Sequence, residues 1–264
     1  MNLKTVVIGA SGFLGSAISA ALGQAGHTVV PVGRGDPLPA GCFDVVVDCA
    51  GDARRFYCNS HPRHAFDANV VPVLDRLLGI DAGLYVFAST VDVYGAGKAD
   101  PATSDEESPI RASELDGYSF SKFLAEQLVA RHARRALILR LGTLIGPNLR
   151  KNPVFDALNG HPLRIGETTA LSLVDTRFVA QTLLTLLEAG IDGTINVTGR
   201  GQVRTGDIVA LVQSLFPGLG IAFHSEREDF HYDVAVHRLA GHLPVPSSVA
   251  MLERFMAEQA GKVA

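Results

Sequence analysis

The sequence of 264 residues contains no tryptophan and only three cysteines, Cys42, Cys49 and Cys58. These cysteines form neither an even disulfide framework nor a Cys-x-x-Cys pair, which is typical of proteins in a reducing compartment. We therefore interpret them as core or incidental thiols. The closest histidine pairs have no cysteine or carboxylate partner at a ligand spacing, so the sequence predicts no metal site.

Charge of either sign is sparse and does not cluster. Charged residues make up 19% of the chain, the net charge is −4, and the Lys and Arg residues are scattered, which argues against a nucleic acid partner. No apolar run approaches the roughly 18 residues of a membrane span, and the opening "MNLKTVVIGA" lacks the apolar region of a signal peptide. The sequence predicts a cytoplasmic protein with a small-molecule substrate.

Apolar residues make up 47% of the chain, enough for the core of one large domain or of one domain with a smaller appendage. Short runs rich in Val, Ile and Leu alternate with stretches of helical periodicity. This alternation predicts an α/β protein with a doubly wound parallel sheet. The predicted strands are residues 5–9, 27–33, 43–51, 84–90 and 136–142, and the predicted helices are residues 13–25, 62–78 and 117–133.

The second predicted strand is expected at an edge of this sheet. Only about ten residues, including two prolines, separate it from the third strand, which is too few for a crossover helix and another strand. Pro31 lies within the second strand, and proline lacks the N–H that a central strand must donate. The sheet is therefore predicted to be shortened.

A glycine-rich turn joins the first predicted strand to the first predicted helix. Glycines at this junction allow a tight turn, the approach of a pyrophosphate to the backbone, and close packing of the helix on the strand. The helix N-terminus offers unpaired N–H groups and a partial positive charge to phosphates. This context predicts a Rossmann domain that binds a dinucleotide. The predicted contacts are Gly9, Ser11, Gly12, Phe13, Leu14 and Gly15.

The residue after the second strand bears on the choice of dinucleotide. An acid there binds the ribose 2′-hydroxyl of NAD, whereas an arginine can pair with the 2′-phosphate of NADP. This chain has Arg34 at that place, and guanidinium geometry suits a phosphate. The sequence favours NADP as the cofactor, with NAD as the alternative because Asp36 lies two residues further on.

Five segments resemble, in order, the landmarks of the extended short-chain dehydrogenases/reductases. This superfamily contains nucleotide-sugar epimerases, dehydratases and 4-keto reductases. The resemblance spans most of residues 5–200 and implies a Rossmann fold, a nicotinamide cofactor and a Ser/Thr-Tyr-Lys mechanism. The segments are the glycine turn, "ASTVDVYG" (88–95), "YSFSK" (118–122), "RLGTLIGP" (140–147) and "LVDTRFVA" (173–180).

The resemblance implies three catalytic residues, Thr90, Tyr118 and Lys122. Positions i and i+4 share one helical face, so Lys122 can lie near the phenol of Tyr118 and also contact the cofactor ribose. A neighbouring cation favours the phenolate, so Tyr118 is expected to act as the general acid/base. Thr90 matches the hydroxyl that stabilises charge on the substrate oxygen, and Ser89 fits this register less well.

Further cofactor contacts are carried over from the resemblance alone. They include the stretch at the end of the third predicted strand, a helical asparagine, and the segment from Leu141 to Leu144 beside the nicotinamide. The residues are Cys49, Ala50, Gly51, Asn69, Leu141 and Thr143. The chain departs from the family pattern at Val174-Asp175, where no arginine precedes to bind a substrate diphosphate. Arg150, Lys151 or Arg164 could replace it.

The chain is expected to contain a Rossmann domain and a small C-terminal substrate domain. After residue 147 the sequence becomes polar and rich in turns, and the last predicted helix can be capped by Ser247 or Ser248. The Rossmann domain is predicted at residues 1–147 and 171–198, and the substrate domain at residues 148–170 and 199–264. The apolar helices at 62–78 and 117–133 could pair in a homodimer, as the resemblance implies.

Three functions are compatible with these patterns. The first is an NADP-dependent reductase that acts on a carbonyl or secondary alcohol of a sugar or nucleotide-sugar. The second is a nucleotide-sugar epimerase or dehydratase that retains NAD and returns the hydride. The third is a catalytically silent dinucleotide sensor or scaffold, which the presence of Thr90, Tyr118 and Lys122 argues against.

Overall fold

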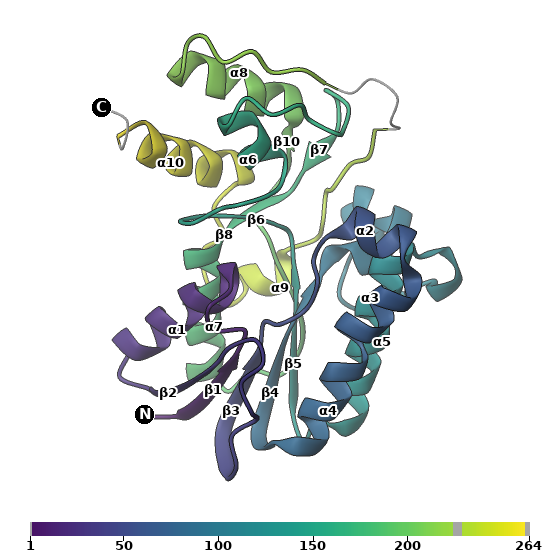
Figure 1. Ribbon diagram of the computed structural model, residues 1–264, viewed down its shortest axis with the longest axis vertical. Coiled ribbons are helices and arrows are strands. Elements are labelled where there is room, and N and C mark those ends of the chain that lie inside the picture. Colours follow the sequence, from purple (N-terminus) through teal and green to yellow (C-terminus); the bar gives the residue numbers. More distant parts are fainter. Residues whose placement is uncertain (1, 224–228, 262–264) are drawn as a thin grey trace.

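The computed structural model describes residues 2–223 and 229–261. Its centre is a six-stranded sheet in the order β2-β1-β3-β4-β5-β9, and every neighbouring pair of strands is parallel (Figure 1). This confirms the predicted doubly wound sheet. The strands are β1 (Lys4–Ile8), β2 (Thr28–Val32), β3 (Cys42–Asp48), β4 (Asp81–Thr90), β5 (Ala136–Leu141) and β9 (Gly193–Val197).

Strand β2 lies at the edge of the sheet, as Pro31 predicts. It pairs only with β1 among the described strands, with Pro31 opposite Val7. The short segment that follows β2 leads directly into β3, which pairs with the other side of β1. The strand that a crossover helix would have added is therefore missing from this part of the sheet.

Helices cover both faces of the sheet (Figure 1). Alternate residues of β1 enter different cores: Val7 packs with α1 and α7, whereas Val6 and Ile8 pack with α4 and α5. The helices on the first face are α1 (Phe13–Gln24) and α7 (Thr176–Glu188), and those on the second are α3 (Pro62–Asn69), α4 (Val71–Gly79) and α5 (Gly117–His132).

The single helix predicted at 62–78 is two helices. The break falls at Val70, which ends α3 and precedes α4. Pro72 lies in the first turn of α4, where its missing N–H does no harm. In the interior of one continuous helix, the same proline would remove a hydrogen bond and clash with the preceding turn.

The other elements form a layer beyond the carboxyl ends of the strands (Figure 1). Ser247, one of the two predicted candidates, caps the last helix, because its Oγ accepts from Ala250 N. The helix α9 (His237–Ala240) contacts β9 of the main sheet.

The elements beyond the sheet are β6 (Thr143–Ile145), α6 (Pro153–Leu158), β7 (Ala170–Leu171), β8 (Leu173–Asp175), β10 (Val203–Arg204), α8 (Thr205–Leu215) and α10 (Ser248–Ala260). The remaining helices are α2 (Arg55–Ser60) and the 3-10 helices η1 (Val91–Ala99), η2 (Pro101–Thr103) and η3 (Ala112–Glu114).

Two small sheets lie in this layer: β6 pairs with β8 in parallel, and β7 pairs with β10 in antiparallel. The core on the α1 face continues into it, since buried residues of α6, α8 and α10 belong to the same cluster. The division of the chain into two domains stays a prediction. Within the described residues, no helix is both long enough and apolar enough to cross a bilayer.

Gly15 fixes the distance between α1 and the glycine turn. A Cβ built on Gly15 would lie 2.1 Å from Gly9 O and 2.7 Å from Gly9 C, both backbone atoms that cannot rotate away. Gly23, in the same helix, would meet nothing within 4 Å. The helix can therefore reach the turn only because residue 15 has no side chain.

We expect Gly15→Ala to lower the free energy of unfolding by about 1 to 3 kcal/mol, the usual cost of overpacking. Gly23→Ala is the matched control and should raise it by about 0.5 to 1 kcal/mol, because alanine favours the helix. Urea unfolding followed by circular dichroism measures both. Equal effects of the two substitutions would contradict the packing argument.

Candidate active site

The predicted site residues lie at the carboxyl edge of the sheet. Gly9 follows β1, Cys49 follows β3, Thr90 ends β4 and Leu141 ends β5. Parallel strands bring their carboxyl ends to one edge, so four distant segments meet there. The helix after β1 covers one face and the helices after β3 cover the other (Figure 1). A crevice at such a switch point is where open α/β sheets bind ligands.

The turn after β1 has the geometry of a phosphate cradle. Gly9 adopts φ +77°, and a Cβ there would lie 3.1 Å from Ala50 N, so the turns after β1 and β3 touch through their backbones. Gly12 caps α1 without a side-chain acceptor, and no acid lies in the first helical turn. The first N–H groups of α1 therefore remain free of side-chain partners and suit an anionic group.

Asn69 holds the turn after β3 in place. Its Oδ1 accepts from Asp52 N at 2.7 Å, and its Nδ2 donates to Asp52 O and to Ser121 Oγ, both at 3.2 Å. A Cβ on Gly51 would lie 2.8 Å from the same Oδ1. Asn69 thus joins this turn to α5, and its predicted contact with a cofactor stays a prediction.

Asp48, which the sequence reasoning missed, anchors the end of β3. Its buried carboxylate accepts from Arg76 Nη1 at 3.0 Å and from Tyr85 Oη at 2.7 Å. Burial and the Asp48 charge together raise the pKa of the neighbouring Cys49, so this thiol stays protonated. In the sequence, an aspartate at the end of a Val-Val-Val run could have indicated a buried carboxylate at this strand end.

Arg34 lies exposed just beyond β2. Among the described residues its guanidinium has no hydrogen bond or ion pair. The nearby Asp36 accepts from Gly33 N at 2.7 Å, so its carboxylate already stabilises the turn. The structure thus leaves a free guanidinium at the position where the sequence predicts recognition of a 2′-phosphate.

Tyr118 and Lys122 are buried residues of α5 that lie one helical turn apart. Lys122 Nζ donates to Ala88 O at 2.7 Å and lies 4.1 Å from the centre of the Phe87 ring. Burial lowers the pKa of Lys122 to about 8. One turn further along α5, Glu126 accepts from Ser89 Oγ, whereas the Thr90 hydroxyl at the end of β4 is bonded to Asp92.

Burial raises the pKa of Tyr118 well above its usual value, and the Asp92 carboxylate adds to this effect. The sequence predicts a phenolate only with a neighbouring cation and a bound oxidised nicotinamide, so that expectation stays a prediction. Without a cofactor, the Lys122 ammonium bonds to a main-chain carbonyl of β4, whereas Tyr118 packs with Cys58 and Ala65. With the chain's own groups alone, Tyr118 is a neutral proton donor.

A buried group of charges beside these residues was not predicted. Asp92 accepts from Lys98 Nζ at 2.9 Å and from Tyr232 Oη at 2.6 Å, and it lies 3.6 Å from Arg55 Nη1. Its Oδ2 also accepts from Thr90 Oγ1 at 3.2 Å. Burial opposes ionisation of Asp92, but Lys98 and Arg55 outweigh it and hold its pKa at about 2.

This group connects the end of β4 with α2 and the C-terminal segment. Arg55 also pairs with Asp116, the N-cap of α5, at 2.8 Å. An acid between Val91 and Val93 signals a buried charge in the sequence, but nothing along the chain identifies its partners. Asp92 therefore orients the Thr90 hydroxyl and ties it to the helix that carries Tyr118.

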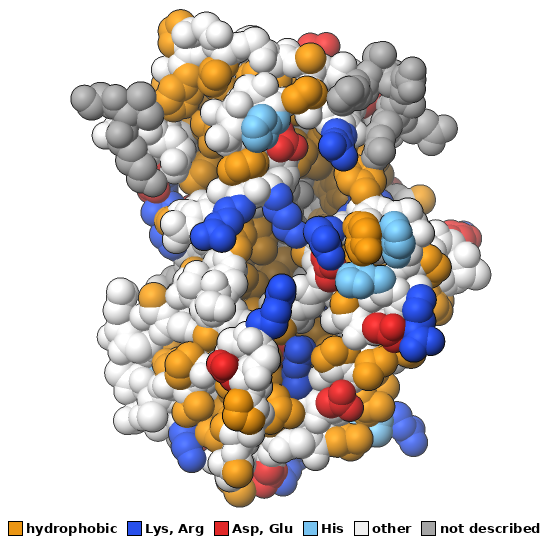
Figure 2. All heavy atoms as spheres, in the orientation of Figure 1, with side chains coloured by type: hydrophobic (Ala, Val, Ile, Leu, Met, Phe, Trp, Pro, Cys, Tyr) orange, Lys and Arg blue, Asp and Glu red, His pale blue; other side chains and the backbone are white. Residues whose placement is uncertain are grey.

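Figure 2 shows a hollow on this face of the molecule, between the upper helices and the sheet, with Lys and Arg side chains around it. Two other cavities contain none of the predicted site residues. One of about 630 Å³ adjoins Cys42, Asp81 and Arg134, and one of about 240 Å³ lies between α7 and α10. The candidate site is therefore defined by the convergence of residues at the carboxyl edge.

Comparisons with known proteins agree with this geometry. A family model described as "NAD dependent epimerase/dehydratase family" matches residues 5–159. The chain is 26% identical over 231 residues to the "Probable low-salt glycan biosynthesis reductase Agl14" of Haloferax volcanii, which covers 76% of each protein.

Two solved structures illustrate the shared fold. A UDP-galactose 4-epimerase superposes with a TM-score of 0.79 at 22% identity, covering 98% of this chain and 99% of that one. A dTDP-4-dehydrorhamnose reductase from Bacillus anthracis in complex with NADP gives a TM-score of 0.78 at 19% identity, covering 97% and 99%. At these identities the likeness concerns the fold alone.

The family match spans more than half of the chain and includes the glycine turn, Thr90, Tyr118 and Lys122. It confirms the resemblance to the extended short-chain dehydrogenases/reductases and the prediction of an NAD(P)-dependent enzyme. The chain belongs to the NAD dependent epimerase/dehydratase family.

Proposed function

We propose that this protein is an NADP-dependent reductase of a carbonyl group, with Thr90, Tyr118 and Lys122 as its catalytic residues. The observation that carries this proposal is the series of contacts that leads from Thr90 through Asp92 and Arg55 to Asp116, the N-cap of the helix that carries Tyr118 and Lys122. A carbonyl reduction needs a proton for the oxygen as well as a hydride for the carbon. Bound NADPH would supply the hydride, and Tyr118 Oη would supply the proton.

The other two residues support this transfer. The Thr90 hydroxyl donates its one proton to Asp92 Oδ2 in the unliganded protein, and it would turn from Asp92 to donate to the carbonyl oxygen as negative charge develops there. The ammonium of Lys122 is held by Ala88 O in the absence of other ligands and would lie at the ribose of the cofactor. Its pKa of about 8 leaves it mostly charged at neutral pH.

The cradle supports the dinucleotide contacts proposed at Gly9, Ser11, Gly12, Phe13, Leu14 and Gly15. The free N–H groups of α1 suit the pyrophosphate, and the backbone contact between Gly9 and Ala50 leaves no room for side chains. Arg34, exposed and without a partner among the described residues, would pair with the 2′-phosphate of NADP. Contacts from Cys49, Gly51, Leu141 and Thr143 remain part of the same proposal.

The substrate is proposed to be a sugar or nucleotide-sugar with a carbonyl or secondary alcohol. The hollow above the carboxyl edge, with its Lys and Arg side chains, suits a ligand that carries phosphate (Figure 2). Lys151 belongs to the segment above the sheet, and its charge interacts with Asp52 and Arg54 of the turn after β3. Residues 148–170 and 199–264 are therefore proposed to form the substrate-binding part.

An epimerase or dehydratase that retains NAD is the alternative. The name of the matching family favours it, as does Asp36 close to Arg34. The two functions differ in how the enzyme uses its cofactor. A reductase consumes added NADPH, whereas an epimerase keeps its NAD through dialysis and shows no net redox change. A catalytically silent sensor would neither consume NADPH nor convert a substrate.

We also propose that the protein is cytoplasmic. The three cysteines are free thiols, which suits a reducing compartment.

Tyr118→Phe removes only the phenolic oxygen, so we expect NADPH binding to be nearly unchanged while turnover falls about 10²-fold or more. Cofactor fluorescence titration and a single-turnover assay measure the two quantities. Tyr57→Phe on the partly exposed face of α2 is the matched control and should keep full turnover. Normal turnover in Tyr118→Phe would disprove the assignment of the proton donor.

Arg34→Ala should weaken NADPH binding about tenfold or more and leave NADH binding almost unchanged, because only NADPH carries the 2′-phosphate. Calorimetric titration with both cofactors gives the comparison. Arg131→Ala, an exposed arginine in the last turn of α5, is the control. A similar loss for both cofactors in Arg34→Ala would exclude NADP recognition by this residue.

We further propose that a second copy of the chain covers the outer face of α3, α4 and α5. Large apolar side chains are exposed there, with Leu78 70% exposed and Phe66, Val71 and Phe120 more than 40% exposed. Exposed apolar side chains on three neighbouring helices suit an isologous interface with a second copy. The helices are those that the sequence predicts to pair.

Leu78→Glu combined with Phe120→Glu should convert a dimer into a monomer, because two carboxylates would be buried without partners. Light scattering after size-exclusion chromatography measures the mass. Val249 is an exposed residue of α10, and Val249→Glu should leave the mass unchanged. If the unsubstituted protein is itself a monomer, the proposed dimer is wrong.

A further inference from the structure

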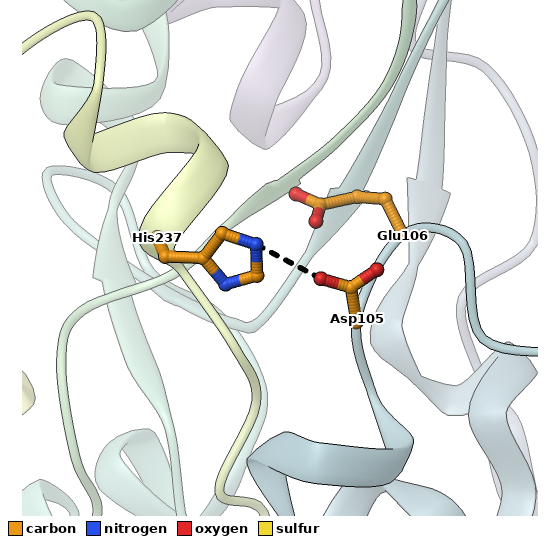
Figure 3. A group of neighbouring side chains, drawn as sticks. All are labelled: Asp105, Glu106 and His237. Atoms are coloured by element: carbon orange, nitrogen blue, oxygen red, sulfur yellow. Dashed lines mark ion pairs between the residues drawn. The ribbon is translucent and has the colours of Figure 1, made fainter.

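Three side chains with metal-binding chemistry lie together outside the candidate active site (Figure 3). Asp105 and Glu106 follow η2, and His237 begins α9. One ligand atom from each lies within 4.8 Å of the other two, and His237 Nε2 lies 2.9 Å from Asp105 Oδ2. Figure 3 shows the two carboxylates and the imidazole turned toward one another.

Glu106 carries the observation that points to a missing ligand. The residue is only 9% exposed, and its Oε1 accepts from Asn196 N at 2.8 Å. Its Oε2 is buried and has no hydrogen-bond partner among the described residues. A buried carboxylate oxygen without a partner is costly, so a group that the chain does not itself provide is expected beside it.

The surrounding structure holds the three ligands in place. Asn196 of β9 donates from Nδ2 to Ser104 O at 2.8 Å and to Ala235 O at 3.0 Å. It therefore connects the segment that carries Asp105 with the segment that leads into α9. Asp105 Oδ1 also accepts from Glu107 N at 2.8 Å, so Oδ2, which pairs with His237 Nε2, is the oxygen that faces the other two ligands.

We propose that Asp105, Glu106 and His237 bind a divalent transition-metal ion of the Zn²⁺ class. One imidazole and two carboxylates form a ligand set that such an ion accepts, with water in the remaining position. Ligand atoms around tetrahedral Zn²⁺ lie roughly 3.4 Å apart, so the Asp105–His237 pair at 2.9 Å must open by about 0.5 Å, and any pair near the 4.8 Å limit must close. The side chain of His237 is 70% exposed and is free to make this movement.

The ion would link the segment after η2 to α9, which are distant in the sequence. Such a link acts only in the folded state and therefore stabilises it. The site contains none of the residues proposed to bind the cofactor or to act in catalysis. His237 lies within residues 199–264, the proposed substrate-binding part, but metal binding and thermal unfolding are measured without turnover, so the metal site stands or fails independently of the proposed catalytic residues.

The test is calorimetric titration of the chelator-treated full-length protein with Zn²⁺ at pH 7.5, followed by thermal unfolding. We expect one site per chain with a micromolar or lower Kd, and a rise in Tm of about 5 °C at a hundredfold excess over Kd. His237→Asn and Glu106→Gln should both remove this site. Glu106→Gln keeps the acceptor for Asn196 N, and His237 is exposed, so both variants should fold.

His161→Asn is the matched control, because His161 also lies near a carboxylate, Asp156, but no third ligand is present among the described residues. It should keep the site and the rise in Tm. Absence of a stoichiometric site in the native protein would overturn the proposal. So would unchanged binding in both His237→Asn and Glu106→Gln, or binding of Mg²⁺ as tight as that of Zn²⁺, since Mg²⁺ avoids imidazole.

Discussion

The packing of α5 against the carboxyl half of β4 is the contact on which the candidate site depends. It buries three charged side chains, Lys122, Glu126 and Arg140. Arg140 donates to both oxygens of Glu126, and Ser89 Oγ donates to the same carboxylate, so this pair is well compensated. Among the described residues, Lys122 has only a carbonyl oxygen and an aromatic ring as close partners.

Lys122 is therefore a residue whose charge opposes folding. Its pKa in the folded protein, about 8, lies below the ordinary value of 10.5, so the folded state binds this proton less tightly than the unfolded state. The loss of folding free energy caused by burying this charge is complete below about pH 8. It declines as the pH rises toward 10.5. A buried ammonium without a carboxylate partner is expected where a ligand completes its surroundings, and functional sites commonly reduce stability in this way.

The second feature that organises the site is the ionised carboxylate of Asp92. It joins the end of β4 to α2 through Arg55 and to the C-terminal segment through Tyr232. Thr90 Oγ1 is bonded to the same carboxylate, so its orientation depends on segments that lie far away in the sequence. Any shift of the C-terminal segment would therefore be transmitted to the Thr90 hydroxyl.

Much of the fold could be predicted because its determinants are local. Pro31 placed β2 at the edge, and the spacing of the Val-rich runs defined the parallel sheet. The break between α3 and α4 also had a local cause, Pro72, whose effect the apolar periodicity concealed. Gly15 was assigned its packing role correctly, since a side chain there would collide with the backbone of Gly9.

The parts of the site that escaped prediction depend on contacts between distant segments. Asp92 was visible in the sequence, but Arg55, Lys98 and Tyr232 approach it only after folding. The protonation of Tyr118 escaped for the same reason. A helical spacing of four residues indicates that Lys122 shares its face, but not that the ammonium turns to Ala88 O.

The protonation of Tyr118 also bears on the direction of the proposed reaction. An epimerase begins by oxidation, in which the phenol must already have lost its proton to accept one from the substrate hydroxyl. Burial and the Asp92 carboxylate oppose that state, and the positive charge of an oxidised nicotinamide would have to compensate for both. A reductase begins with a neutral phenol and a neutral dihydronicotinamide, so the proposed reduction would need no such compensation.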